Sequence, residues 1–361
     1  MTRPDILALR IAAALAGAAT LASPANVLAQ ATGTPPTATV AAPAAASSQA
    51  GPLLYVSNER GQSVTVINTV TNKVVNTIPL GVVRPRGIHL SADGKRMFVA
   101  LSDTSDEITR QLKILTPADG IAVIDIATGK VEAKYPAGTD PEQFAVSPDG
   151  KRLYASNEDA GTTSVIDLVS GKVAQTLNVG IEPEGVGMSP DGRWVYVTAE
   201  TSNTVSVIDV DTDKVVANLL VDVRPRAVAF APDGSRAYVT AEVGGTLSII
   251  DTKTQQVVRT VDLENGEAKP VGVVLSPDGK RVYTANGSKN SVSVIDAQTG
   301  QLIRNIPVGR RPWGIAISRD GKRIYTANGL SDDVSVVDTD SGAVIATIPA
   351  GKAPWGLALS S

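Results

Sequence analysis

Residues 312–351 are PWGIAISRDGKRIYTANGLSDDVSVVDTDSGAVIATIPAG, and this stretch decides the fold. Short segments rich in β-branched and aromatic residues alternate with turn signals, which predicts strands at 313–318, 323–328, 334–339 and 344–350. The first turn contains Asp320-Gly321, and sibling turns elsewhere in the chain are Ser-Pro-Asp-Gly. Proline fits the second position of such a turn, and glycine fits the position where φ is positive. The stretch is therefore one antiparallel unit of four strands.

The unit recurs along the chain. A V-x-V-I-D-like segment ends at seven positions, and a proline opens another segment seven times. The first set is Asn68, Asp125, Asp167, Asp209, Asp251, Asp296 and Asp338; the second is Pro85, Pro141, Pro183, Pro225, Pro270, Pro312 and Pro354. Most steps are 42 residues long. A period of about 42 residues is typical of propeller blades.

The two ends of the repeat region complement each other. It starts at 53–58 with a second-strand sequence, LLYVSN, and ends at 355–360 with a first-strand sequence, WGLALS. We therefore predict an all-β, seven-bladed β-propeller in which N- and C-terminal strands share one blade. Closure removes the open sheet edges. An open solenoid is the alternative, but its polar capping repeats are absent from the sequence.

The sequence before the repeats predicts export. Arg3 and Arg10 precede an apolar run and the small-x-small pattern Val27-Leu28-Ala29, which together indicate a signal peptide over 1–29. Residues 30–51 have the composition of a flexible Ala/Pro/Thr linker, and 52–361 form the propeller. The expected location is periplasmic or secreted, with no membrane span in the mature chain. A retained anchor is the alternative.

Composition excludes several classes of site. The chain has no cysteine, so disulfides, thiolate nucleophiles and iron–sulfur clusters are excluded. The formal net charge of −3 gives no general attraction to nucleic acid. His89 is the only histidine, which excludes a histidine-rich metal site; we expect it in an inner strand, as a packing or water-bridged residue.

The second strands contain YVSN at 55–58, YVTA at 196–199 and YTAN at 283–286, so the chain resembles the YVTN-repeat propellers. Segments ETSN, VANLLVDVRPRA and AEVGGTLS, between Glu200 and Ser248, resemble the periplasmic propellers associated with PQQ-dependent alcohol catabolism. That narrower resemblance implies a quinoprotein dehydrogenase or a cytochrome c as a partner. It transfers no catalytic residue, because fold similarity does not establish function.

One face of the ring is the predicted binding surface, since the loops beside each opening proline meet there around the axis. Its candidate residues are Arg84, Arg86, Asp140, Glu142, Glu182, Glu184, Arg224, Arg226, Arg311, Trp313 and Trp355. The arginines could bind a small anionic ligand and the tryptophans could stack on it. Alternatively, the arginines pair internally with Glu59, Glu158, Glu200 and Glu242, and the tryptophans pack between blades.

Two further features of this face allow more than one interpretation. The long loop 102–118 either covers the mouth or is a neutral excursion. The carboxylates Asp140, Glu142, Glu182 and Glu184 depart from the repeat and could bind Ca²⁺, dock a cationic partner or simply solvate the rim.

No catalytic constellation is evident in the sequence, so the expected function is a non-catalytic periplasmic binding or scaffold propeller. It is predicted to be no enzyme and to need no cofactor or metal. The alternatives are a lactonase-like hydrolase at the axial mouth and a single-stranded DNA-binding propeller. The acidic blades argue against the last one.

Overall fold

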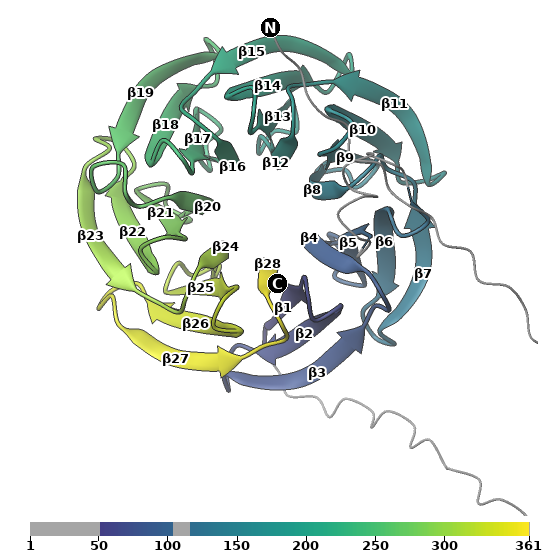
Figure 1. Cartoon of the computed structure of the whole chain (residues 1–361), viewed down its shortest axis with the longest axis horizontal. Coiled ribbons are helices and arrows are strands. Elements are labelled where there is room, and N and C mark those ends of the chain that lie inside the picture. Colours follow the sequence, from purple (N-terminus) through teal and green to yellow (C-terminus); the bar gives the residue numbers. More distant parts are fainter. Residues whose placement is uncertain (1–50, 104–115, 361) are drawn as a thin grey trace, which may run out of the picture. The chain divides into compact units, whose positions relative to one another are not determined.

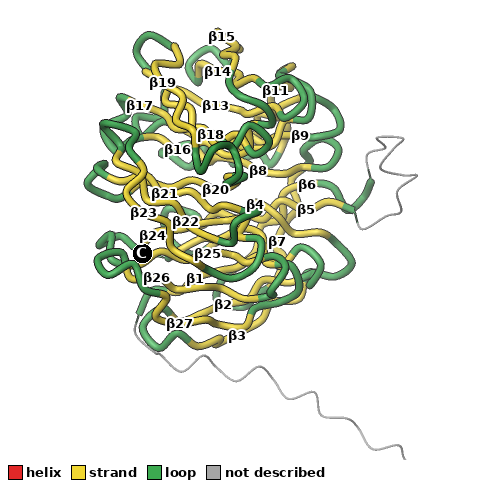
Figure 2. The backbone as a smooth tube through the Cα atoms, turned by 60° about the vertical axis from the view of Figure 1, so that its left-hand side comes forward, coloured by secondary structure: helices red, strands yellow, loops and turns green. Residues whose placement is uncertain are grey.

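The computed structural model describes residues 51–103 and 116–360, and every regular element in that part of the chain is a β-strand. Seven antiparallel sheets of four strands surround a central axis (Figure 1). Figure 2 shows only strands and loops among the described residues. The predicted all-β, seven-bladed propeller is confirmed.

Each blade contributes one strand to each of four positions, counted outward from the axis. The innermost strands are β4 (Arg84–Leu90), β8 (Pro141–Val146), β12 (Pro183–Met188), β16 (Pro225–Phe230), β20 (Pro270–Leu275), β24 (Pro312–Ile317) and β28 (Pro354–Leu359). The second strands are β1 (Leu53–Asn58), β5 (Arg96–Ser102), β9 (Arg152–Asn157), β13 (Trp194–Ala199), β17 (Arg236–Ala241), β21 (Arg281–Asn286) and β25 (Arg323–Asn328). The third strands are β2 (Ser63–Asn68), β6 (Gly120–Asp125), β10 (Thr162–Asp167), β14 (Thr204–Asp209), β18 (Thr246–Asp251), β22 (Ser291–Asp296) and β26 (Asp333–Asp338). The outermost strands are β3 (Lys73–Pro79), β7 (Lys130–Tyr135), β11 (Lys172–Asn178), β15 (Lys214–Leu220), β19 (Gln256–Asp262), β23 (Leu302–Pro307) and β27 (Val344–Pro349).

The first and last described strands close the ring, as predicted. In the sheet β28-β1-β2-β3, Leu54 lies opposite Leu359, and Tyr55 lies opposite Ala358. The backbone N–H of Ser360 also donates to the carbonyl of Leu53 over 2.8 Å. This pairing excludes the open solenoid, because neither end of the ring is left as a bare edge.

The repeated tyrosine of the second strand joins one blade to the next. Tyr154 donates to Asp213 over 2.7 Å, and Tyr238 donates to the carbonyl of Ala297 over 3.0 Å. Both rings are buried between sheets. Burying a large apolar side chain stabilises the fold by about 1.5–3 kcal/mol, so these contacts contribute substantially to holding the blades in place.

Several predicted segments fall partly or wholly outside the described residues. Residues 1–50, which include the expected signal peptide and nearly all of the linker, lie there, as do 104–115 of the 102–118 loop. No helix within the described ranges is long and apolar enough to cross a bilayer.

Candidate functional site

A recurring backbone hydrogen bond places acidic side chains at the mouth. The residue before the inner-strand proline is in the left-handed region in several blades, for example Asp140 at φ 47° and Arg224 at φ 61°. Its carbonyl accepts from the N–H of the residue that follows the second strand of the same blade. Glu158 donates to Asp140 over 3.1 Å, and Glu242 donates to Arg224 over 2.8 Å. Each glutamate is therefore held beside the start of an inner strand.

Contacts between blades fix the backbone of the arginine that follows the inner-strand proline. The Ser57 hydroxyl donates to the carbonyl of Arg86 over 2.5 Å, and the Thr198 hydroxyl donates to the carbonyl of Arg226 over 2.8 Å. A Cβ at Gly185 would collide with that same Arg226 carbonyl, so only glycine permits this approach. The arginine side chains thus start from rigid strands.

The first ion-pair group, the Arg86 cluster, consists of Arg84, Arg86, Glu59, Asp140, Glu142 and Glu158. Arg84 Nη2 lies 3.0 Å from both oxygens of Asp140. Arg86 Nε lies 3.2 Å from Glu59, and its Nη1 pairs with Glu142 and lies 3.6 Å from both Asp140 and Glu158. Two guanidinium groups therefore face four carboxylates.

The second group, the Arg226 cluster, consists of Arg224, Arg226, Arg311, Glu184, Glu200 and Glu242, with the ring of Trp313. Arg226 Nη1 lies 2.7 Å from Glu184 and also pairs with Glu200. Arg311 Nη2 lies 3.0 Å from Glu242. The guanidinium carbons of Arg226 and Arg311 lie 5.1 and 4.7 Å from the centre of the Trp313 ring, within cation–π range.

Burial and neighbouring charges shift the pKa values of two carboxyl groups in the Arg86 cluster in opposite directions. Burial raises the pKa of Glu158 to about 7; Arg86 opposes this, while Glu184 and Asp140 add to it. Burial also pushes the pKa of Asp140 upward, but Arg86 and Arg84 outweigh it and hold that pKa below its usual range. At neutral pH Glu158 is therefore divided between protonated and ionised forms, whereas Asp140 is ionised.

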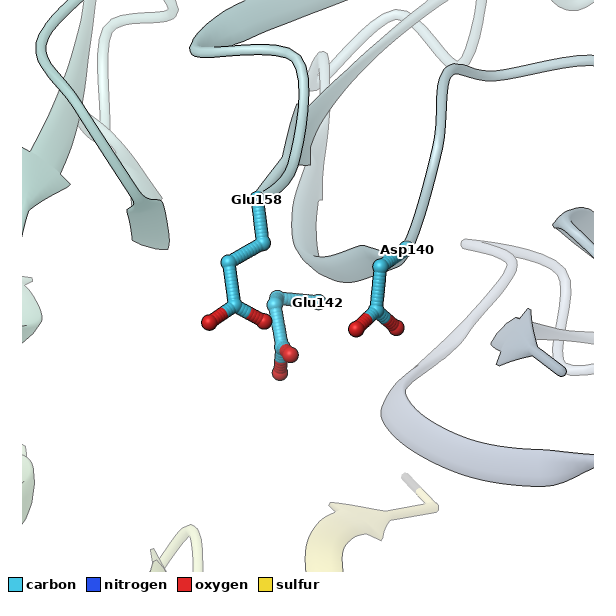
Figure 3. Close-up of side chains that lie close together, drawn as sticks. All are labelled: Asp140, Glu142 and Glu158. Carbon is cyan, nitrogen blue, oxygen red and sulfur yellow. The ribbon is translucent and has the colours of Figure 1, made fainter. Parts of the chain in front are cut away.

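Asp140, Glu142 and Glu158 also have the spacing of a cation site. One oxygen from each lies within 4.8 Å of the others, and Figure 3 shows their carboxylates pointing toward the same space. Arg86 Nη1 contacts or approaches all three. A guanidinium group thus supplies the positive charge that a metal ion would supply. The predicted grouping also included Glu182 and Glu184, which are not part of this set: Glu184 pairs with Arg226, and Glu182 accepts a hydrogen bond from Thr201.

A cavity of about 420 Å³ opens along the axis, and residues of the Arg226 cluster line it. Glu184, Arg226, Trp313 and Trp355 contribute to its wall at the charged layer. Deeper in the wall, the side chains are small or apolar except for His89 and Gln143, among the residues that line it. Cavities of this size in proteins commonly hold small molecules.

His89 faces this cavity from β4, as expected for an inner-strand residue. Desolvation by the surrounding protein lowers the pKa of His89 below its usual value and favours the neutral imidazole at pH 7, although the side chain is exposed to the cavity. Its ring lies 5.2 Å from that of Phe144.

The predicted mouth residues are thus brought together, and the open question of the arginines is answered. Arg84, Arg86, Arg224, Arg226 and Arg311 all pair with carboxylates of the same molecule. The alternative in which Trp313 and Trp355 pack within the molecule is also supported, since Trp355 is only 9% exposed. Their roles in ligand binding stay predictions.

Gln143 also lines the cavity, although it was not among the predicted site residues. A signal was present, because the second residue after the opening proline is glycine in most blades, as at Gly87 and Gly185. In the blade that begins at Pro141, a polar residue, Gln143, takes the place of that glycine. A Cβ on Gly87 would lie 2.5 Å from the Gln143 side-chain oxygen, so the glycine makes room for this amide.

Comparison with protein families places the chain. The model of the choice-of-anchor I domain matches residues 37–221, more than half of the chain. The chain belongs to the choice-of-anchor I family. A second model, the seven-bladed β-propeller lactonase, matches residues 214–348 of this choice-of-anchor I protein.

Individual relatives agree on the propeller. Seven-bladed beta-propeller protein Rv1057 of Mycobacterium tuberculosis is 32% identical over 112 residues, which cover 31% of this chain and 25% of that protein. Hydrazine synthase of Kuenenia stuttgartiensis has a TM-score of 0.68 at 24% identity, covering 80% of this chain and 92% of its own. A candidate 6-phosphogluconolactonase of Bacteroides fragilis has a TM-score of 0.71 at 18% identity, covering 87% and 99%. The two structural likenesses show the fold alone.

The lactonase match corrects one expectation. The chain was predicted to be no enzyme, but a match to a lactonase model over residues 214–348 points to a hydrolase. The prediction rested on the lack of a histidine-based catalytic constellation, which does not exclude catalysis by carboxylates. The association with PQQ-linked oxidation, its quinoprotein or cytochrome partner and the exported location stay predictions.

Proposed function

We propose that this choice-of-anchor I propeller hydrolyses lactones at the axial cavity. The observation that carries the proposal is the meeting of a mostly apolar cavity with buried carboxylate–guanidinium pairs, in a chain that matches a lactonase model. Lactone opening needs a group that takes a proton from water and a positive charge near the carbonyl oxygen. Both kinds of group are present in this layer.

Glu158 is the proposed general base. A base works best when its pKa lies near the working pH, and the pKa of Glu158 is about 7. In the proposed reaction, ionised Glu158 accepts a proton from water as the water oxygen adds to the carbonyl carbon. The ring carbon–oxygen bond then breaks, and Glu158 returns the proton to the departing ring oxygen. The product is a hydroxy acid.

Arg226 and Arg86 are the proposed stabilisers of the negative charge on the carbonyl oxygen. Both are held by carboxylates and by fixed strands, so they need little rearrangement as that charge develops. Glu184 positions Arg226 through the 2.7 Å ion pair.

The test is hydrolysis of a panel of γ- and δ-lactones by the purified protein, followed by the acid released. We expect Glu158→Gln to lower kcat by about 100-fold or more. In the wild type, kcat/KM should rise with pH to a plateau with its midpoint near pH 7, because the base must be ionised.

Glu132→Gln is the matched control. Glu132 lies on the outermost strand β7, 3.2 Å from Arg96 and 43% exposed, so this variant should keep full activity. Absence of hydrolysis across the panel, or equal activities of Glu158→Gln and wild type, would overturn the proposal.

A further inference from the structure

The charge of the mouth limits which lactones it can accept. The Arg86 and Arg226 clusters together contain five guanidinium groups and seven carboxylates, so carboxylates outnumber arginines. Each of the five arginines already has a carboxylate partner. A substrate phosphate or carboxylate would have to displace one of these partners and would then lie beside an uncompensated negative charge.

The wall beyond the charged layer is unsuited to a polyhydroxylated substrate. Val228, Val273, Val274, Ile315 and Leu357 line it, together with small residues of the inner strands. A sugar hydroxyl placed against such side chains loses its hydrogen bonds to water without replacement. Apolar groups gain by leaving water for the same surface.

The polar side chains His89 and Gln143 lie on the neighbouring inner strands β4 and β8. His89 is three residues beyond Arg86, which corresponds to about 10 Å along a strand. The neutral imidazole and the amide can each donate or accept one hydrogen bond to an uncharged group. The cavity therefore has charged side chains at its mouth, an apolar wall further in, and the polar side chains of His89 and Gln143 inside.

We propose that the substrate is an uncharged lactone with an apolar substituent, with its ring at the charged layer and its substituent in the cavity. This inference rests on the proposed lactone hydrolysis for the position of the ring. The ligand class itself follows from the carboxylate excess and the apolar wall.

The test compares kcat/KM for δ-decalactone, δ-gluconolactone and 6-phosphogluconolactone, which differ in apolar chain, hydroxyl groups and phosphate. We expect δ-decalactone to exceed both others by about 100-fold or more. Preference for the phosphorylated lactone would overturn the inference while leaving lactone hydrolysis intact. Preference for δ-gluconolactone would overturn it as well.

Two variants test separately the apolar wall and the carboxylate excess, the two proposed causes of the substrate preference. Val228→Thr is nearly isosteric and places a hydroxyl in the apolar wall, so it should raise KM for δ-decalactone about tenfold and leave kcat unchanged. Glu242→Gln removes the carboxylate that pairs with Arg311, so it should raise kcat/KM for 6-phosphogluconolactone about tenfold. No change in either variant would overturn the inference.

A binding measurement separates this inference from the failure of hydrolysis. If no lactone is hydrolysed, the hydrolysis-resistant lactam analogue of δ-decalactone is titrated against the protein while tryptophan fluorescence is followed, to which Trp313 and Trp355 of the cavity wall contribute. Saturable binding of the lactam, with no response to 6-phosphogluconate, supports the ligand class although hydrolysis has failed. No response to the lactam overturns it.

Discussion

The Arg86 and Arg226 clusters occupy equivalent positions in different blades, yet they differ in composition. Each is centred on the arginine that follows an inner-strand proline, and each gathers carboxylates from neighbouring blades. The Arg86 cluster has two arginines for four carboxylates, whereas the Arg226 cluster has three for three and adds Trp313. The same repeat position thus supports two arrangements. In the Arg86 cluster, burial together with neighbouring carboxylates raises the pKa of Glu158 to about 7. In the Arg226 cluster, equal numbers of arginines and carboxylates hold the guanidinium groups against Trp313.

The largest expected effect comes from breaking the balanced cluster. Arg226→Met leaves Glu184 and Glu200, each about 5% exposed, buried without this cation. Removing one partner of a buried ion pair typically costs about 3–5 kcal/mol, so the free energy of unfolding should fall by that amount at pH 7. Urea unfolding followed by circular dichroism measures the loss.

Arg224→Met is the control for that variant. Arg224 belongs to the same cluster, but its side chain is 47% exposed, and an exposed ion pair contributes less than about 1 kcal/mol. Equal losses for Arg224→Met and Arg226→Met would show that burial does not distinguish the two arginines.

The Arg86 cluster should instead show a dependence of stability on pH. Because the pKa of Glu158 rises from its ordinary 4.5 to about 7 on folding, the folded chain binds more protons than the unfolded chain between those values. This group's contribution to stability is therefore fully present below about pH 4.5 and is lost as the pH rises to about 7. Relative to the wild type, Glu158→Gln should gain up to about 3 kcal/mol from pH 4.5 to pH 8.

Urea unfolding at several pH values tests that gain. Glu132→Gln, on the exposed outer strand, should keep a constant difference from wild type across the range. A constant difference for Glu158→Gln as well would mean that burial and the neighbouring carboxylates do not raise the pKa of Glu158.

The sequence was sufficient for the ring because its signals are local and repeated. The spacing of Asp167, Asp209 and Asp251 counts the blades, and the strand-like ends at 53–58 and 355–360 predict the closure. The sequence also allowed the internal pairing of the mouth arginines with Glu59 and Glu158, because both glutamates follow a second strand and therefore lie on the same face as the arginines.

The pairing partners were not predictable, because they depend on contacts between blades. Asp140 and Glu142 looked like an acidic blade set apart from its basic neighbours, but both contact arginines of β4, on the preceding blade. Likewise, nothing local marks Glu158 as different from Glu200. Its raised pKa comes from burial together with Glu184 and Asp140, which only the assembled ring brings near.

The smallest expected effect concerns the aromatic ring that only the Arg226 cluster contains. Arg311→Lys keeps the charge opposite Glu242 but loses the planar stacking on Trp313 at 4.7 Å. The expected loss is about 1 kcal/mol, read from urea unfolding and accompanied by a change in tryptophan emission. Arg193→Lys is the matched control, because Arg193 stacks on Trp194 at the same 4.7 Å but belongs to neither cluster. A loss of stability confined to Arg311→Lys would mean that Trp313 stabilises the cluster by keeping its guanidinium groups in place. Equal losses for Arg311→Lys and Arg193→Lys would mean that Trp313 contributes no more than any exposed stacking partner. The two clusters would then differ only in their ratio of arginines to carboxylates.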